Sequence, residues 1–190
     1  MNRQQAINFV KKHTTNPNLI KHMLAVGACM RSLAIYFGKD KNEQEKWEVA
    51  GIVHDADYET LKDDGDKHPS LVFDWLEEMG VEESIINAVK AHAWGFSPIC
   101  KQPENHMEWS IYCCDELTGF IIAVTLIRPS KKIADVSVKD VLKKWGKKDF
   151  AKGVIRENIE ICQEKLDISL EKFIEICLGA LQTIADDLGL

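Results

Sequence analysis

The sequence predicts an all-α protein that folds as a single helical bundle over residues 1–190. Apolar residues recur at intervals of three and four in nearly every segment, which is the period of an amphipathic helix, and no segment alternates like a half-buried strand. The low content of glycine and proline argues against a disordered or fibrous chain. A domain of this length buries about 70% of its unfolded surface.

The net charge and the cysteines indicate which binding partners and which cellular compartment to expect. The net charge of −6 argues against a long nucleic acid, whose phosphates favour a basic surface. Small phosphates remain compatible, because a divalent metal reverses the local charge. The six cysteines form no Cys-x-x-Cys pair, which predicts buried free thiols in a reducing cytoplasm. They are Cys29, Cys100, Cys113, Cys114, Cys162 and Cys177.

The hydrophobic segments predict a soluble, cytoplasmic protein that does not contact a membrane. Residues 1–5 lack the apolar core of a signal peptide. The longest apolar run, residues 117–127, contains threonine and glycine and is shorter than the roughly 20 residues that a bilayer requires.

The first third of the chain predicts three helices. The first covers about residues 3–12. The second begins after Asn16-Pro17, an N-cap followed by proline at the first helical position, and ends at Gly38. The third covers about residues 42–55 and ends in the pair His54-Asp55.

An acidic linker, residues 57–67, precedes two shorter helices. Pro69 begins the first of them and Gly80 ends it. The second covers about residues 82–92, and a loop follows over 93–103. The inward face of the first is expected to consist of Val72, Trp75, Leu76 and Met79.

The C-terminal part predicts a long central helix over about residues 104–127 and two final helices over about 153–166 and 170–188. The locally basic stretch between them, 128–148, is interpreted as a solvated face, with phosphate recruitment as a minor alternative. The last helix has an a/d seam, which either caps the bundle or pairs with a second chain in a homodimer.

The pair His54-Asp55 ends an apolar segment, where the presence of titratable side chains requires an explanation. A metal ion supplies one, because it satisfies neutral imidazole and ionised carboxylate together. The dipeptide alone has little specificity. The prediction therefore depends on which other residues accompany it.

Four further residues of this kind lie on or beside apolar predicted helices, and a bundle brings such residues together. A mixed nitrogen and oxygen set suits Fe, Mn, Co or Zn better than thiolate-binding metals. A single histidine on an apolar face is more often a core residue than a ligand, so the combination carries the prediction. The four are His22, His68, His92 and Asp115.

In this order and spacing, His22, His54-Asp55, His68-Pro69, His92 and Asp115 resemble the HD-domain phosphohydrolase superfamily. The resemblance covers about residues 16–127, which leaves 128–190 as a helical extension. Within the superfamily the chain is most similar to bacterial predicted hydrolases of this length without an assigned substrate. Those share stretches like 115–119, 128–132 and 153–157.

The resemblance implies an HD-type bundle with two divalent ions per chain. His22, His54, Asp55 and Asp115 would hold the first ion, and His68 and His92 the second, with Asp55 bridging. A metal-activated water would then attack the phosphorus of a small phosphorylated substrate, expected to be a nucleotide. With one ion only, His68 and His92 would bind substrate or transfer a proton.

The chain departs from the better-known subgroup where that subgroup has glycine and lysine, since Asp57 and Tyr58 stand there. This argues against the cyclic dinucleotide activity of that subgroup. Asp57 is expected to act as a general base, to orient the attacking water, or to be merely solvated. The residues that are candidates to replace the missing phosphate-binding lysine are Lys62, Lys67, Arg128, Lys131 and Lys132.

Other polar and aromatic residues have alternative interpretations. Glu116 is turned about 100° from Asp115 on a helix, so it is expected to act beside the ligands rather than as one. Trp94 and Phe96 either line a pocket for a base or, more commonly, pack on the core. His13 and His106 are expected at the surface.

Two other functions stay open. One is a di-iron oxygenase on the same scaffold, which would cleave C–C or C–P bonds. The other is a non-catalytic module that senses a nucleotide through the same pocket.

Overall fold

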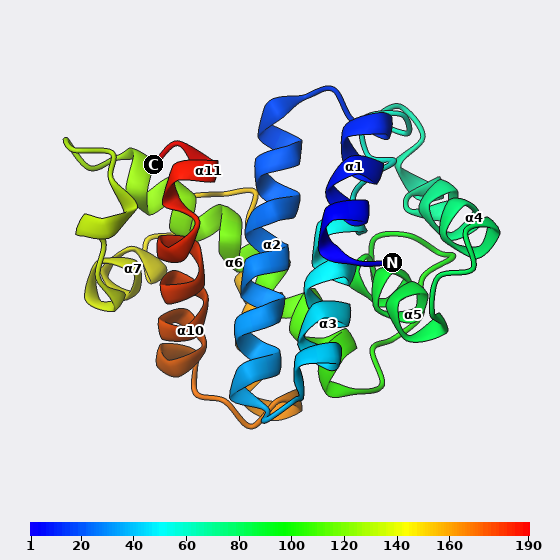
Figure 1. The fold of residues 1–190 in the computed structure, drawn as a ribbon. Helices are drawn as coiled ribbons and strands as arrows, with labels where there is room; N and C mark the ends of the chain where they lie inside the picture. The colour runs from blue at the N-terminus through cyan, green and yellow to red at the C-terminus, as the bar shows by residue number, and fades with distance from the viewer.

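The structure, a computed structural model of residues 1–190, confirms the all-α class and contains no strand. In Figure 1, α2 runs through the middle of the molecule, with α1 and α3 on one side, α10 on the other, and α6 crossing behind. In chain order the elements are α1 Arg3–His13, α2 Pro17–Tyr36, α3 Lys41–Val53, η1 Gly65–Lys67, α4 Ser70–Glu78, α5 Glu83–His92, α6 His106–Leu126, η2 Ile133–Asp135, α7 Val138–Trp145, α8 Arg156–Glu160, α9 Cys162–Lys165, α10 Leu170–Thr183 and α11 Ala185–Leu188.

Polar caps set where the main helices begin. The Asn16 side chain caps α2, with Pro17 at the first helical position as predicted. Asp40 caps α3 and Asn105 caps α6 in the same way. Each cap satisfies backbone N–H groups that have no partner inside the helix. The long helices therefore start at defined residues, which fixes where their later side chains point.

Two glycines allow α2 and α3 to approach closely. A Cβ at Gly51 would lie 2.7 Å from both the Cα and the N atoms of Gly27, so no side chain separates the two backbones there. This contact sets α2, which carries His22, against the end of α3, where His54 and Asp55 follow. The packing of the fold thus determines how close these three residues come.

The central position predicted for the helix around 104–127 is confirmed. α6 packs against α2, α5, α8 and α10, and most of its residues are buried. α2 and α6 are both long and apolar enough to cross a membrane, but 44% and 67% of their most apolar windows are buried inside the protein. The core helices of a soluble protein have this same character. All six cysteines are free, and all but Cys100 are buried.

The seam of the last helix packs within the chain. Ile174, Cys177 and Leu181 are fully buried, and α10 packs on α2, α6 and α7. The seam therefore caps the bundle and is not available to a second chain. A homodimer stays a prediction, without this seam as its basis.

The structure corrects the expected elements in the C-terminal part. The basic stretch contains a further helix, α7, which Ser137 begins with a capping box and which buries Val141. The helix expected over 153–166 begins only at Arg156 and is divided into α8 and α9. The last helix likewise ends at Thr183, and α11 follows it.

The inward face of α4 also differs from the expectation. Phe73 is buried there with Val72 and Leu76, whereas Met79 is 55% exposed. The reason is that α4 ends at Glu78, before a further turn brings the chain back to the core. Trp75 is half-buried and stacks on His13, with ring centroids 3.8 Å apart.

Candidate metal centre

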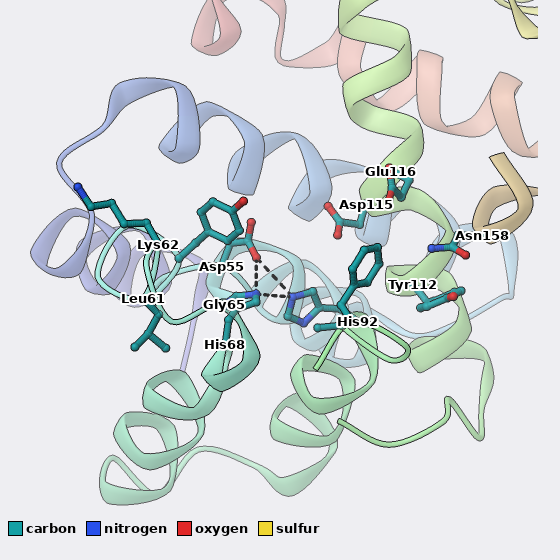
Figure 2. A pocket seen from close by; sticks show the side chains of 13 residues that line it. Asp55, Leu61, Lys62, Gly65, His68, His92, Tyr112, Asp115, Glu116 and Asn158 are labelled. Carbon is teal, nitrogen blue, oxygen red and sulfur yellow. Dashed lines mark hydrogen bonds and ion pairs between the residues drawn. The ribbon is translucent and has the colours of Figure 1, made fainter. Parts of the chain in front are cut away.

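Five elements bring the six predicted ligands to one place. His22 lies in the second turn of α2, His54 and Asp55 follow α3, and Asp115 lies in the middle of α6. His68 directly precedes Pro69 and α4, and His92 is the last residue of α5. Figure 2 shows the side chains of Asp55, His68, His92 and Asp115 directed toward a common space. The structure thus assembles every residue of the predicted set.

The turn that carries Asp55 is held by the segment between α1 and α2. The Thr14 hydroxyl donates to the Ala56 carbonyl at 3.1 Å. The Glu59 carboxylate accepts hydrogen bonds from the Thr15 backbone N–H and hydroxyl, each at 2.7 Å, and from the Asn16 N–H at 3.1 Å. An irregular turn gains its order from such contacts because it has no ladder of its own. The His54-Asp55 pair is therefore fixed relative to the start of α2.

The Asp55 carboxylate lies at the centre of the cluster. Its Oδ2 is 3.6 Å from His22 Nε2, and its Oδ1 is 3.5 Å from His54 Nε2. The same Oδ1 is 3.1 Å from His68 Nε2 and 3.4 Å from His92 Nε2. Asp115 Oδ1 closes the other side, 2.9 Å from His22 Nε2. Oδ2 of Asp55 thus faces His22 and Oδ1 faces the other three histidines, so the two oxygens point to different parts of the cluster.

All four histidines present the same nitrogen to this centre. Nδ1 of His54 is 2.8 Å from the Gly51 carbonyl, and Nδ1 of His92 is 2.6 Å from the Val89 carbonyl. A carbonyl oxygen only accepts, so these Nδ1 atoms carry a proton, and Nε2 is the nitrogen that remains to bind an ion. His68 Nδ1 is bound in the same way by Asp57 and His22 Nδ1 by Thr118. Partners of this kind orient metal-binding histidines.

The geometry fits a metal ion. His54 Nε2 is a buried polar atom with no hydrogen-bond partner. It lies 3.6 Å from Asp115 Oδ1, and it belongs to groups of three residues whose ligand atoms lie within 4.8 Å of one another. Ligands at about 2.1 Å from an ion in octahedral geometry lie about 3 Å apart. Two groups of this kind occur, His22 with His54 and Asp115, and His54 with Asp55 and His92.

The electrostatics of the cluster favour cations. Burial alone would lower the pKa of His54, but the Asp55 and Asp115 carboxylates outweigh it and raise that pKa to about 9. His68 behaves likewise, since Asp55 and Asp57 overcome its burial and raise its pKa to about 9. The histidines in turn hold the pKa of Asp55 and of Asp115 well below the usual range despite burial. Ions that bind here replace protons on the imidazoles.

Asp57 is neither solvated nor directed at the centre. It is fully buried, and its Oδ1 accepts from His68 Nδ1 at 2.6 Å. Its Oδ2 accepts from the backbone N–H groups of Leu71 and Val72 at the start of α4. The expectation of a solvated acid is wrong, and these contacts do not support a general base. Asp57 is placed to position His68.

A cavity of about 380 Å³ lies over the cluster on the side of His68 and His92. This size lies within the range of small-molecule sites. Tyr58, Phe96 and Tyr112 contribute aromatic surface, and Leu61 adds aliphatic surface (Figure 2). Glu116 lies at the rim, where burial raises its pKa to about 7.

Two of these lining residues, Asn158 and Tyr112, lie outside the predicted site. Asn158 enters the cavity from α8, far along the chain from Asp115, and the HD-like pattern does not include it. Tyr112 lies one turn before Asp115 and Glu116 on α6, and helical periodicity alone would have found it.

The five candidate phosphate-binding cations differ in whether they reach the cavity. Of the five cations expected near phosphate, only Lys62 lines the cavity, while Lys67 pairs with Asp64 and Arg128 with Asp140. Lys131 and Lys132 are exposed and do not line it.

The structure also shows where the remaining aromatic and histidine residues of the prediction lie. Phe96 is 58% exposed in the cavity, whereas Trp94 packs on Trp109 and Tyr112. His106 is exposed as expected, and His13 is half-buried.

Comparison with known families decides which of them the site belongs to. The model of the HD domain matches residues 19–111. Residues 19–111 of this chain belong to the HD-domain superfamily. The matched part of the HD domain contains all the predicted ligands except Asp115, which follows four residues beyond it. HD domains are mostly metal-dependent phosphohydrolases, and the His/Asp cluster of this one is compatible with divalent metal. No curated protein and no solved structure matches the chain significantly.

Proposed function

We propose that the protein is a metal-dependent phosphohydrolase that cleaves a phosphoester or phosphoanhydride of a small molecule, with a nucleotide as the expected substrate. One observation carries the proposal. Four histidines, each with its Nδ1 hydrogen-bonded, direct Nε2 at two carboxylates, and one of these Nε2 atoms is buried without a partner. Packing alone does not explain this arrangement, because a buried polar atom without a hydrogen-bond partner destabilises the fold.

In this proposal two divalent ions of Fe, Mn, Co or Zn bind per chain. His22, His54, Asp55 and Asp115 hold the first, and His68 and His92 hold the second, with Asp55 shared. Bound ions of this kind lower the pKa of a water and polarise a phosphoryl oxygen. The role of the chain is to hold the ligands in place before substrate binds, through the hydrogen bonds to the Nδ1 atoms of the histidines.

The cavity supports a substrate with a flat apolar part. Tyr58 is 49% exposed and Phe96 is 58% exposed, and both line the cavity. Exposed aromatic faces in a pocket stack on planar groups such as a nucleobase. Lys62 is the one lysine or arginine among the lining residues, and its side chain points away from the His/Asp cluster in Figure 2.

The test combines metal content with phosphate release. We expect about two transition ions per chain in freshly purified protein and their loss in Asp55→Ala. Asp64→Ala, an exposed acid in the same linker, serves as the control that keeps both ions. Hydrolysis of nucleotide monoesters, diesters and anhydrides is then screened under the metal found, with oxygen consumption measured in parallel. Metal without hydrolysis of any of these, or oxygen consumption that depends on reduced iron, would contradict the hydrolase.

The cellular setting also belongs to this proposal. Free buried thiols and buried apolar helices support a soluble protein in the cytoplasm. The acidic net charge supports a small phosphorylated partner rather than a long nucleic acid or a membrane surface.

A further inference from the structure

A second pocket opens onto the same cluster from another side. It has a volume of about 310 Å³ and is lined by His22, Asp55 and Asp115 from the centre, with Leu19, Gly119 and Val154 as its apolar walls. Tyr58 and Glu116 line both this pocket and the larger cavity. The two pockets are therefore two arms of one groove that crosses the centre.

The second arm is on the more accessible side of the centre. The side chains of His22 and Asp115 are 25% and 24% exposed, whereas those of His54 and His92 are 0% and 3% exposed. A phosphoryl group bound at the centre is thus not enclosed on the His22 side. A substrate that ends in a terminal phosphate has no second substituent that would occupy an apolar space on the His22 side.

Gly119 is the residue that leaves this arm open. It lies one helical turn after Asp115 on the same face of α6. A Cβ built at Gly119 meets no atom within 4 Å, so the space beside the centre is free. Leu19 and Val154 flank it with aliphatic surface. The arm can take a slim apolar substituent, and Glu116 is its one charged side chain beyond the centre itself.

Apart from the proposed ions, the residues of the groove supply a bound phosphate group with a single cation. Asp55, Asp115 and Glu116 line both arms, and Lys62 is the one lysine or arginine in either. A phosphomonoester carries nearly two negative charges at pH 7 because its second pKa is about 6, whereas a phosphodiester carries one. Of the two, the diester also has a substituent for each arm.

We propose that the substrate is a phosphodiester whose second substituent lies in the arm formed by Leu19, Gly119 and Val154. This rests on the proposed hydrolase function and specifies its substrate class. Water oxygen bonds to phosphorus, the P–O bond to one substituent breaks, and that substituent leaves as an alcohol with one water proton. The other proton is released as the phosphomonoester product ionises.

The test fills the second arm and measures binding. Gly119→Leu places a branched side chain in the arm, and Gly179→Leu makes the same change at an exposed helical glycine on α10 that also has no atom within 4 Å. Dibutyl phosphate and butyl phosphate, which hydrolyse very slowly, are titrated calorimetrically into the metal-containing protein. Each buried methylene is worth about fourfold in affinity. We therefore expect Gly119→Leu to lower the affinity ratio of dibutyl to butyl phosphate at least tenfold, and Gly179→Leu to leave it unchanged.

Three outcomes would overturn the proposal. These are a wild type that binds butyl phosphate as well as dibutyl phosphate, a Gly119→Leu variant that weakens both equally, and an absence of binding to either. Hydrolysis of p-nitrophenyl phosphate and of bis(p-nitrophenyl) phosphate by the wild type is measured in parallel. If neither ester is cleaved, the hydrolase proposal fails, while the binding ratios still decide on the second arm. If the esters are cleaved but the ratio does not change, the second arm fails and the hydrolase stands.

Discussion

Replacing Asp57 by asparagine tests whether this buried carboxylate positions His68. Asparagine has nearly the same shape but only one accepting oxygen. In the structure, Oδ1 of Asp57 accepts from His68 and Oδ2 accepts from the Leu71 and Val72 N–H groups. The variant must therefore turn its NH₂ group toward one of these donors. Either His68 or the start of α4 loses its acceptor.

The magnitude follows from that loss. A buried donor without a partner costs about 1–3 kcal/mol. If asparagine keeps its oxygen on the α4 amides, this cost falls on the orientation of His68 and lowers the affinity of the second ion about 10- to 100-fold. The first ion is unaffected, because Asp57 contacts none of His22, His54 and Asp115.

The assay is a competition between the protein and a chromophoric chelator, which resolves the two affinities separately. Asp64→Asn, in the same linker but exposed and paired with Lys67, is the matched control. Selective weakening of one ion in Asp57→Asn supports the positioning role. Unchanged affinity for both ions, or equal weakening of both, would refute this reasoning, since the second result indicates a general loss of structure.

Three further predictions concern the fold and its metal. Removing the ions with a chelator lowers Tm, because an ion present at 100 times its Kd contributes about 2.7 kcal/mol, and thermal denaturation before and after metal is restored measures this. Gly51→Ala destabilises by about 3 kcal/mol in urea denaturation, because its Cβ would lie 2.7 Å from backbone atoms of Gly27 that have no room to move. Gly179→Ala, in open space, is the control and gains up to about 1 kcal/mol. Arg156→Lys, which loses guanidinium bonds to the backbone carbonyls of 145–154, lowers stability by about 1–3 kcal/mol and speeds chymotryptic cleavage in that segment.

Helical periodicity predicted the fold class and the first six α-helices, because long apolar faces with clear caps dominate there. It did not predict α7, although Val138, Val141, Leu142 and Trp145 follow a helical spacing. Because lysines stand between these apolar residues, the segment was predicted to be a solvated face. The division of the helices near Ile161 and Ile184 has no glycine or proline to signal it, and tertiary packing sets it.

For the site, the residue types and their order were sufficient to find the six clustered side chains, because five stand in or directly after an apolar helix and His68 directly precedes one. The burial of Asp57 and its bond to His68 were not predicted, since Asp57 follows α3 in an irregular turn where no periodicity shows which way a side chain points. Asn158 and Val154 could not be found at all. They come from the C-terminal extension, and only the packing of α8 on α6 brings them to the groove.

The proposed ligands differ in how they are attached to the fold. His22 and Asp115 lie within packed helices, whereas His68 follows a polar segment of turns and a single 3₁₀ turn. Segments of this kind open locally at lower free energy than core helices. An ion bound through His68 would therefore exchange faster than its neighbour. With two ions bound as proposed, a scarce metal would divide the molecules into singly and doubly loaded forms, and turnover would follow the metal supply of the cell.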